Sequence, residues 1–237
     1  MTTELRGEVA VVTGALGNLG PVWTAALADA GMRVVGLDVR AADGVEVADV
    51  TNRAALTAVL ERVGTPRVLV NNAGIDQPPG SGAGAGSDDD FLRVLDVNTR
   101  GTFVASQVFG SAMQQAGGGG SIVNIGSLYA SISPIPAFYD HLPEFVKPPA
   151  YGASKAGVVQ LTKWLARHLA PVRVNALSPG GVRGDQDDEF LRKYTERVPL
   201  ARMAEPQDLV GPLLFLASDA SRYVTGHELR VDGGFLA

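Results

Sequence analysis

Short runs of consecutive apolar residues alternate along the chain with longer stretches in which apolar residues recur at helical spacing. The first run, Val9–Val12, is apolar at every position, which is typical of a parallel strand buried on both faces. Further strands are expected at 33–38, 45–49, 68–71, 122–125, 172–177 and 228–231. Helices are expected at 21–30, 53–63, 89–115, 150–169, 187–197 and 206–217. This alternation predicts an α/β fold with a doubly wound parallel sheet, in a single domain that covers residues 1–237.

Two segments interrupt the alternation. Residues 77–90 are rich in Gly, Pro and Ser, and we expect them to form a mobile surface loop. Residues 131–149 contain five prolines and cannot form a regular helix. This second segment joins the strand at 122–125 to the helix at 150–169, so it begins near the carboxyl end of a parallel strand, where ligands bind in this architecture.

Composition narrows the classes of protein to which the chain can belong. A net charge of -5 and a pI near 5.2 offer no basic surface, so we expect neither a nucleic-acid partner nor binding to an anionic membrane. No apolar run reaches the roughly 20 residues that span a bilayer, and the polar start lacks the apolar core of a signal peptide. With no cysteine and only three scattered histidines, no metal site is expected. The expectation is a cytoplasmic enzyme with a small-molecule substrate.

A glycine-rich turn, Thr13–Gly20, joins the first predicted strand to the first predicted helix. Gly14 allows a tight turn, Gly17 or its neighbour lets the backbone approach a pyrophosphate, and Gly20 lets the helix pack on the strand. The free N–H groups at the helix start would then bind the anion. The turn favours a dinucleotide-binding Rossmann fold, with cofactor contacts at Gly14, Leu16, Gly17, Asn18 and Leu19. The alternative is a glycine-rich strand–helix turn that binds nothing.

Asp38 ends the second predicted strand, 18 residues after Gly20. A carboxylate at this place accepts hydrogen bonds from the adenosine ribose hydroxyls and repels a 2′-phosphate, which favours NAD over NADP. Arg40 argues the other way, because an arginine beside the site can pair with a phosphate. No basic residue lies in the glycine turn itself, so NAD is the expected cofactor. The alternative for Asp38 is a solvated loop carboxylate.

Tyr151 and Lys155 stand four residues apart on a predicted helix and therefore share one face. An ammonium near a phenol favours the phenolate and lowers a pKa that is otherwise about 10. Such a tyrosine exchanges a proton with an alcohol near neutral pH. The alternative is an ordinary surface pair, since this spacing is common by chance.

Further motifs accompany this pair in a fixed order along the chain. They are Asp49-Val50, Asn71–Gly74, Asn98, Ile122–Ser127, Arg173–Asn175, Ser178–Val182 and Val231–Gly234. Together with the glycine turn and Tyr151–Lys155, they resemble the short-chain dehydrogenase/reductase family over nearly the whole chain.

The resemblance implies a role for each matching residue. Tyr151 is the expected acid/base, Lys155 lowers its pKa and holds the nicotinamide ribose, and Ser127 hydrogen-bonds the substrate oxygen. Asn98 holds a water that links Lys155 to solvent. The remaining implied cofactor contacts are Asp49 and Val50 at the adenine, Asn71, Asn72, Ala73 and Gly74 on the adenosine side, and Pro179, Gly180 and Val182 at the nicotinamide. For Asn71 and Asn98 the alternative is a packing or capping role.

The chain departs from the compact family pattern in three places. Asn18 occupies the usual middle glycine, and this spacing resembles the extended branch with its nucleotide-sugar epimerases and dehydratases, although 237 residues leave no room for that branch's added domain. Ser127 and Tyr151 lie 24 positions apart, a longer gap than usual, so Ser131 and Ser133 are rivals for the catalytic serine. Arg183 stands where a threonine is usual after Val182.

Two segments are expected to form the walls of the substrate site. Residues 128–149 form a substrate-side insertion, and residues 181–199 form a lid. The polar side chains expected on these walls are Tyr139, His141, Lys147, Arg183 and Gln186. They suit a hydroxyl-rich or anionic substrate, and the resemblance extends to members that act on sugars or polyols. The alternative is that these charges only solvate a mobile lid.

The sequence thus predicts an NAD-dependent oxidoreductase that moves a hydride between the nicotinamide and a secondary alcohol or ketone. A non-catalytic NAD-binding sensor or scaffold, or an epimerase- or dehydratase-like enzyme, remains as an alternative. The helices at 89–115 and 150–169 carry more apolar surface than one sheet face needs, so a homodimer or homotetramer is expected.

Overall fold

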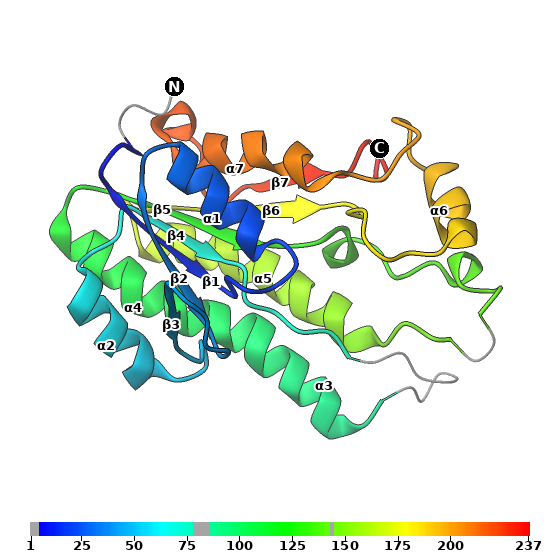
Figure 1. Cartoon of the computed structure of the whole chain (residues 1–237), viewed down its shortest axis with the longest axis horizontal. Helices are drawn as coiled ribbons and strands as arrows, with labels where there is room; N and C mark the ends of the chain where they lie inside the picture. Colours follow the sequence, from blue (N-terminus) through cyan, green and yellow to red (C-terminus); the bar gives the residue numbers. More distant parts are fainter. Residues whose placement is uncertain (1–4, 78–85, 143–144) are drawn as a thin grey trace.

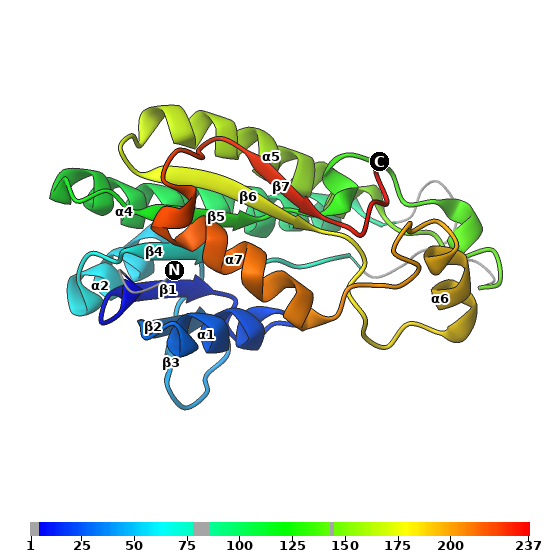
Figure 2. The same cartoon turned by 90° about the horizontal axis from the view of Figure 1, so that it is seen from above.

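The computed structural model describes residues 5–77, 86–142 and 145–237, which form one seven-stranded parallel sheet between two layers of helices (Figures 1 and 2). The strands are β1 (Val9–Thr13), β2 (Arg33–Asp38), β3 (Val45–Val47), β4 (Val68–Asn71), β5 (Ser121–Ile125), β6 (Arg173–Pro179) and β7 (Glu228–Val231). They lie in the order β3-β2-β1-β4-β5-β6-β7. The predicted doubly wound α/β fold is confirmed. The expected loop at 77–90 falls largely outside the described residues.

The sheet is buried because its central strands are apolar on both faces. Every residue of β4 and β5 is buried, as are all residues of β1 after Val9. On one face α1 (Gly20–Asp29) and α7 (Val210–Ala217) contribute Trp23, Leu27 and Leu213 to one core cluster. On the other face the helices are α2 (Arg53–Val63), α4 (Gly101–Ala116) and α5 (Pro149–His168). Figure 1 shows α1 and α7 on the opposite side of the strands from α2 and α4.

The long helix predicted at 89–115 is not one regular helix. It begins as α3 (Asp88–Leu95), passes through a π-helical turn at Asp96–Arg100 and continues as α4. The turn contains Asn98, whose Nδ2 donates to the Ile75 carbonyl (2.9 Å) and whose Oδ1 accepts from the Ile75 N–H (2.8 Å). These long-range hydrogen bonds hold Asn98 toward the loop after β4, an interaction that helical periodicity does not reveal.

The segment between β5 and α5 is irregular, as its prolines predict. It contains single 3-10 turns at Leu128–Ala130 and Pro136–Phe138, and α5 begins at Pro149, where proline is favoured. α6 (Asp188–Thr195) packs against this segment at the end of the molecule toward which β6 points (Figure 1). The two share a third apolar cluster: Leu128, Phe138, Phe190, Tyr194, Val198 and Met203.

Some predicted boundaries are wrong by a few residues. The third strand ends at Val47, and the helix expected at 187–197 is α6, which is shorter. The helix expected at 206–217 begins as a 3-10 turn, Pro206–Leu209, before α7. Within the described parts of the chain, none of the helices combines the length and apolarity that a membrane span requires.

Candidate active site

A cavity of about 1060 Å³ follows the carboxyl ends of the strands and crosses the point between β1 and β4 where the strand order reverses. Most of the site residues predicted from the sequence line it. They are Gly14, Gly17, Asn18, Leu19, Asp38, Asp49, Val50, Asn72, Ala73, Gly74, Ser127, Tyr151, Lys155 and Gly180. Leu16, Asn71, Asn98, Pro179 and Val182 are not among the lining residues. Asn71 is buried and donates to Ser106 and Asn124, so it has a packing role. The structure therefore brings the glycine turn and Tyr151 to one continuous cavity.

The glycine turn packs tightly against the loop after β4. Gly14 has a φ of +65°, and a Cβ added there would lie 2.7 Å from the Ala73 Cα. A Cβ at Gly20 would lie 2.4 Å from the Gly14 carbonyl oxygen, so both positions exclude a side chain. The Asn72 Nδ2 donates to the carbonyls of Thr13 (3.1 Å) and Gly14 (2.8 Å). Asn72 thus lines the cavity while its amide group fixes the turn.

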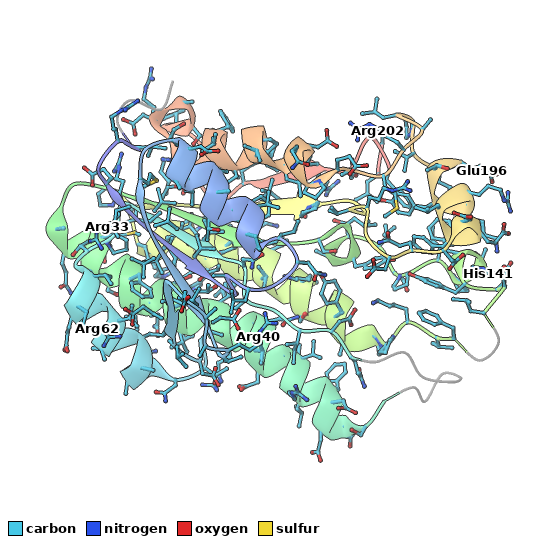
Figure 3. The ribbon with its side chains drawn as sticks, in the orientation of Figure 1. Arg33, Arg40, Arg62, His141, Glu196 and Arg202 are labelled. Carbon is cyan, nitrogen blue, oxygen red and sulfur yellow. The ribbon has the colours of Figure 1, made fainter. Side chains whose placement is uncertain are left out.

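Asp38 is 7% exposed and its carboxylate is held by three groups. Oδ2 accepts from the Leu16 N–H (3.0 Å), and Oδ1 accepts from the Arg40 backbone N–H (3.0 Å) and Nε (3.2 Å). Burial opposes ionisation, but these hydrogen bonds outweigh it and hold the pKa of Asp38 below its ordinary value. Asp38 is therefore an ionised acceptor at one end of the cavity. The backbone N–H of Leu16 helps to hold its carboxylate in place. In Figure 3 Arg40 lies on the β2–β3 side, whereas His141 lies beside α6.

Tyr151, Lys155 and Ser127 meet at the other end. The Lys155 Nζ lies 5.6 Å from the centre of the Tyr151 ring and donates to the Ile125 carbonyl (2.7 Å). Ser127 is 8% exposed, follows β5 and lies close enough to Tyr151 to act on the pKa of its phenol. Its rivals Ser131 and Ser133 are exposed and lie outside the cavity lining. Of the three serines, Ser127 is the one placed beside Tyr151.

The ionisable groups at this end are perturbed chiefly by burial. Burial lowers the pKa of Lys155 to about 8, against a smaller opposing effect of Asp76. Burial also raises the pKa of Tyr151 to about 12, and Asp76 adds to this effect while Ser127 opposes it. The sequence predicted a lowered pKa for Tyr151. That prediction is wrong for this structure, because burial raises the pKa.

Asn98 lies just behind Lys155. A Cβ added at Gly74 would lie 3.3 Å from Asn98 Oδ1 and 3.7 Å from Lys155 Nζ, so the bare glycine leaves the space between them open. The Asn98 Nδ2 also donates to the Ser154 hydroxyl on α5 (2.9 Å). Asn98 thus joins the π-helical turn, the loop after β4 and α5.

The substrate-side walls differ in part from the sequence prediction. Tyr139, Lys147 and Gln186 line the cavity, but His141 and Arg183 do not. The Gln186 amide accepts from the Gly184 N–H (2.7 Å) and donates to the Val182 carbonyl (3.0 Å), so it holds its own loop. The His141 Nε2 lies 2.8 Å from the Asp187 carboxylate, an interaction that ties the insertion to the start of α6.

Sequence reasoning did not single out the polar lining residues Asp76 and Arg93, nor Tyr129 within the predicted insertion. Asp76 forms an ion pair with Lys147, and the Tyr129 hydroxyl lies 3.3 Å from the Tyr139 hydroxyl. A signal for Asp76 was present, because it follows the Asn71–Gly74 motif at the carboxyl end of a strand.

Comparisons with known proteins agree with this geometry. A family model described as Enoyl-(Acyl carrier protein) reductase matches residues 14–236. A short-chain dehydrogenase from Leptospira borgpetersenii, solved with bound NAD+, superposes with a TM-score of 0.90 at 34% identity, over 100% of this chain and 95% of that chain. The chain belongs to the short-chain dehydrogenase/reductase family.

Relatives within the family act on sugars and polyols. Galactitol 2-dehydrogenase (L-tagatose-forming) of Cereibacter sphaeroides is 38% identical, over 98% of this chain and 96% of that protein. A gluconate 5-dehydrogenase from Burkholderia cenocepacia, solved with NADP and tartrate, has a TM-score of 0.85 at 29% identity, over 99% of this chain and 98% of that chain. The relatives thus include neutral and acidic substrates, and the solved structures include both nicotinamide cofactors.

Proposed function

We propose that this chain is an NAD-dependent dehydrogenase that interconverts a secondary alcohol and a ketone in a sugar or polyol, with Tyr151 as the acid/base. One observation carries the proposal. Tyr151, Ser127 and Lys155 meet at one end of a cavity whose other end holds the glycine turn and Asp38.

The residues of this chain fit a dinucleotide. The glycine turn packs closely against the loop after β4 and leads into the start of α1, where free N–H groups would hold a pyrophosphate, and Asp38 offers a fixed carboxylate to ribose hydroxyls. The ionised Asp38 favours NAD, because it repels a 2′-phosphate. Arg40 is already paired with Asp38 and does not oppose this preference.

When bound, the nicotinamide accepts a hydride in the oxidation and donates one in the reduction. Tyr151 takes the hydroxyl proton in the oxidation and returns it in the reduction, while Ser127 donates a hydrogen bond to the same substrate oxygen. Lys155 supplies a positive charge 5.6 Å from the centre of the Tyr151 ring and holds the nicotinamide ribose. Asn98, next to Lys155 at Gly74, holds the water that links Lys155 to solvent.

The substrate class rests on the relatives together with the polar walls. The relatives described above are named for galactitol and gluconate, and Tyr139, Lys147 and Asp76 offer hydrogen-bonding groups to a hydroxylated molecule. The experiment is oxidation of a panel of polyols and sugars with NAD+ by the purified protein and by Tyr151→Phe. Turnover by the wild type and its loss in the variant support the proposal. Turnover of hydrophobic ketones alone contradicts the substrate class.

The proposed enzyme is a homodimer or homotetramer. α4 and α5 present Phe103 and Trp164, whose rings pack edge to face at 6.3 Å while Trp164 stays 46% exposed. Such an aromatic surface on two long helices suits a twofold contact. The cytoplasmic location expected from the sequence stays a prediction.

A further inference from the structure

An ion pair crosses the substrate end of the cavity. Asp76, in the loop after β4, and Lys147, on the insertion, lie 71 positions apart in the sequence, and both line the cavity. The Lys147 Nζ is 5.8 Å from the centre of the Tyr151 ring, close to the 5.6 Å of Lys155. The pair therefore lies beside the ring of Tyr151, in the same cavity.

Both members of the pair keep hydrogen-bonding capacity. Asp76 accepts from Lys147 at Oδ2 and from the Gln77 N–H (2.8 Å) at Oδ1, which leaves further lone pairs on each oxygen. Lys147 uses one of its three N–H donors in the ion pair. Their side chains are 32% and 24% exposed, so a ligand can reach them without rearrangement of the core. Two neighbouring hydroxyls, one donating to Asp76 and one accepting from Lys147, match this arrangement.

The charges around the pair give no net attraction for an acidic substrate. Asp76 and Lys147 cancel one another, and beyond the cofactor end with Asp38, Arg40 and Asp49 the other charged residues that line the cavity are Lys155, Arg93, Asp185 and Asp187. These four add two positive and two negative charges. A carboxylate placed beside Lys147 would therefore also meet Asp76 and gain no net attraction.

We propose that Asp76 and Lys147 form a subsite for the hydroxyls next to the reacting carbon, and that it selects a neutral polyol or sugar over the corresponding sugar acid. This subsite rests on the dehydrogenase function proposed above. Asp76 sets the selectivity, because it accepts from a hydroxyl and repels a carboxylate.

The test compares kcat/KM for matched substrates with NAD+, galactitol against galactonate and glucitol against gluconate. The wild type is expected to prefer the neutral member of each pair. Asp76→Asn leaves Lys147 unpaired, so the ratio of acid to neutral substrate rises by about tenfold, the effect of one charge-assisted hydrogen bond. Lys147→Gln leaves Asp76 unpaired, so the same ratio falls.

Opposite shifts in the two variants separate recognition from a merely structural role, since either substitution breaks the same link between the insertion and the loop after β4. Asp140→Asn is the matched control. It removes the ion pair of Asp140 with Lys193 on α6, outside the cavity, and leaves the ratio unchanged.

A wild-type preference for the acids, or equal ratios in Asp76→Asn, Lys147→Gln and wild type, overturns the subsite and leaves the dehydrogenase function intact. Absence of turnover with every polyol and sugar acid contradicts the dehydrogenase function itself, and the subsite with it. A variant that unfolds is recognised by its lowered melting temperature. The other variant then tests the subsite by the direction in which its ratio of kcat/KM for acid and neutral substrate changes.

Discussion

Asp38 and Lys155 are buried charged residues at opposite ends of the cavity, 7% and 5% exposed. Burial opposes the charge on both, but their partners differ. Asp38 receives N–H donors from Leu16 and Arg40, which hold its pKa down, whereas Lys155 donates to one carbonyl and its pKa falls to about 8. Asp38 therefore stays ionised. The buried ammonium of Lys155, in contrast, lowers the stability of the folded protein, because burial disfavours its charged form.

Replacing Asp38 with alanine is expected to change the cofactor preference. The substitution removes the carboxylate that repels a 2′-phosphate and releases Arg40 to pair with one. We expect kcat/KM with NADP+ to rise and that with NAD+ to fall, each by at least about tenfold. Adding Arg40→Met to Asp38→Ala is expected to remove the gain with NADP+. An unchanged NAD preference in Asp38→Ala would show that Asp38 does not select the cofactor.

Lys155→Met is expected to raise the stability of the protein near pH 7 while it abolishes turnover. The pKa of Lys155 is lowered from 10.5 to about 8, so the unfolded chain binds more protons than the folded chain between these values, and wild-type stability rises with pH there. The destabilisation by the charged lysine is complete below pH 8, where the variant gains roughly 1–3 kcal/mol. Chemical denaturation at pH 7 and pH 9.5 measures this, and the difference between the proteins shrinks at the higher pH. A variant less stable than wild type at pH 7 is the contrary result.

At the scale of elements, the insertion and α6 form a unit of their own. Phe138 from the insertion is 3% exposed and packs against Phe190 and Tyr194 of α6, each with ring centres 5.8 Å away. This cluster is separate from the two clusters that flank the sheet. The substrate-side wall is therefore held by its own apolar contacts, whereas the glycine turn and Asp38 belong to the sheet.

Phe138→Ala is expected to loosen this wall without disturbing the cofactor end. Truncating a buried phenylalanine costs about 3–5 kcal/mol where it packs, and here the loss falls on the insertion and α6. We expect faster hydrogen exchange in α6 and a KM for substrate raised at least about fivefold, with NADH affinity unchanged. Phe109→Ala, on the buried face of α4, is the matched control and lowers the stability of the whole domain. Equal protection of α6 in Phe138→Ala and wild type would contradict a separate unit.

At the scale of the whole molecule, the sequence predicted those strands and helices whose residue pattern lies within the element itself. Short apolar runs such as Val9–Val12 are typical of buried strands, and their alternation with helical stretches predicted the parallel sheet. The π-helical turn around Asn98 was not predictable, because it depends on hydrogen bonds to Ile75 across the fold. The end of the third strand is likewise set by pairing with β2 rather than by its own residues.

The candidate site divides in the same way. Gly14, Asp38, Tyr151 and Lys155 carried recognisable spacing, and the structure brings them to one cavity. The raised pKa of Tyr151 was not predictable, because it depends on burial and on Asp76, which the chain brings close only on folding. The ion pair of Asp76 with Lys147 was not predictable either, because no sequence motif links the two segments that it joins.

Comparison of Tyr151→Phe with the wild type tests the central claim most directly. Phenylalanine keeps the ring that packs against Tyr129 at 6.4 Å and removes only the hydroxyl that exchanges the proton. We expect kcat for polyol oxidation by NAD+ to fall by about 10²–10⁴-fold, the usual contribution of a positioned acid/base, while NADH binds with wild-type affinity. A variant that binds NADH and still oxidises the polyol at the wild-type rate would contradict the assignment of Tyr151, and with it the proposed mechanism.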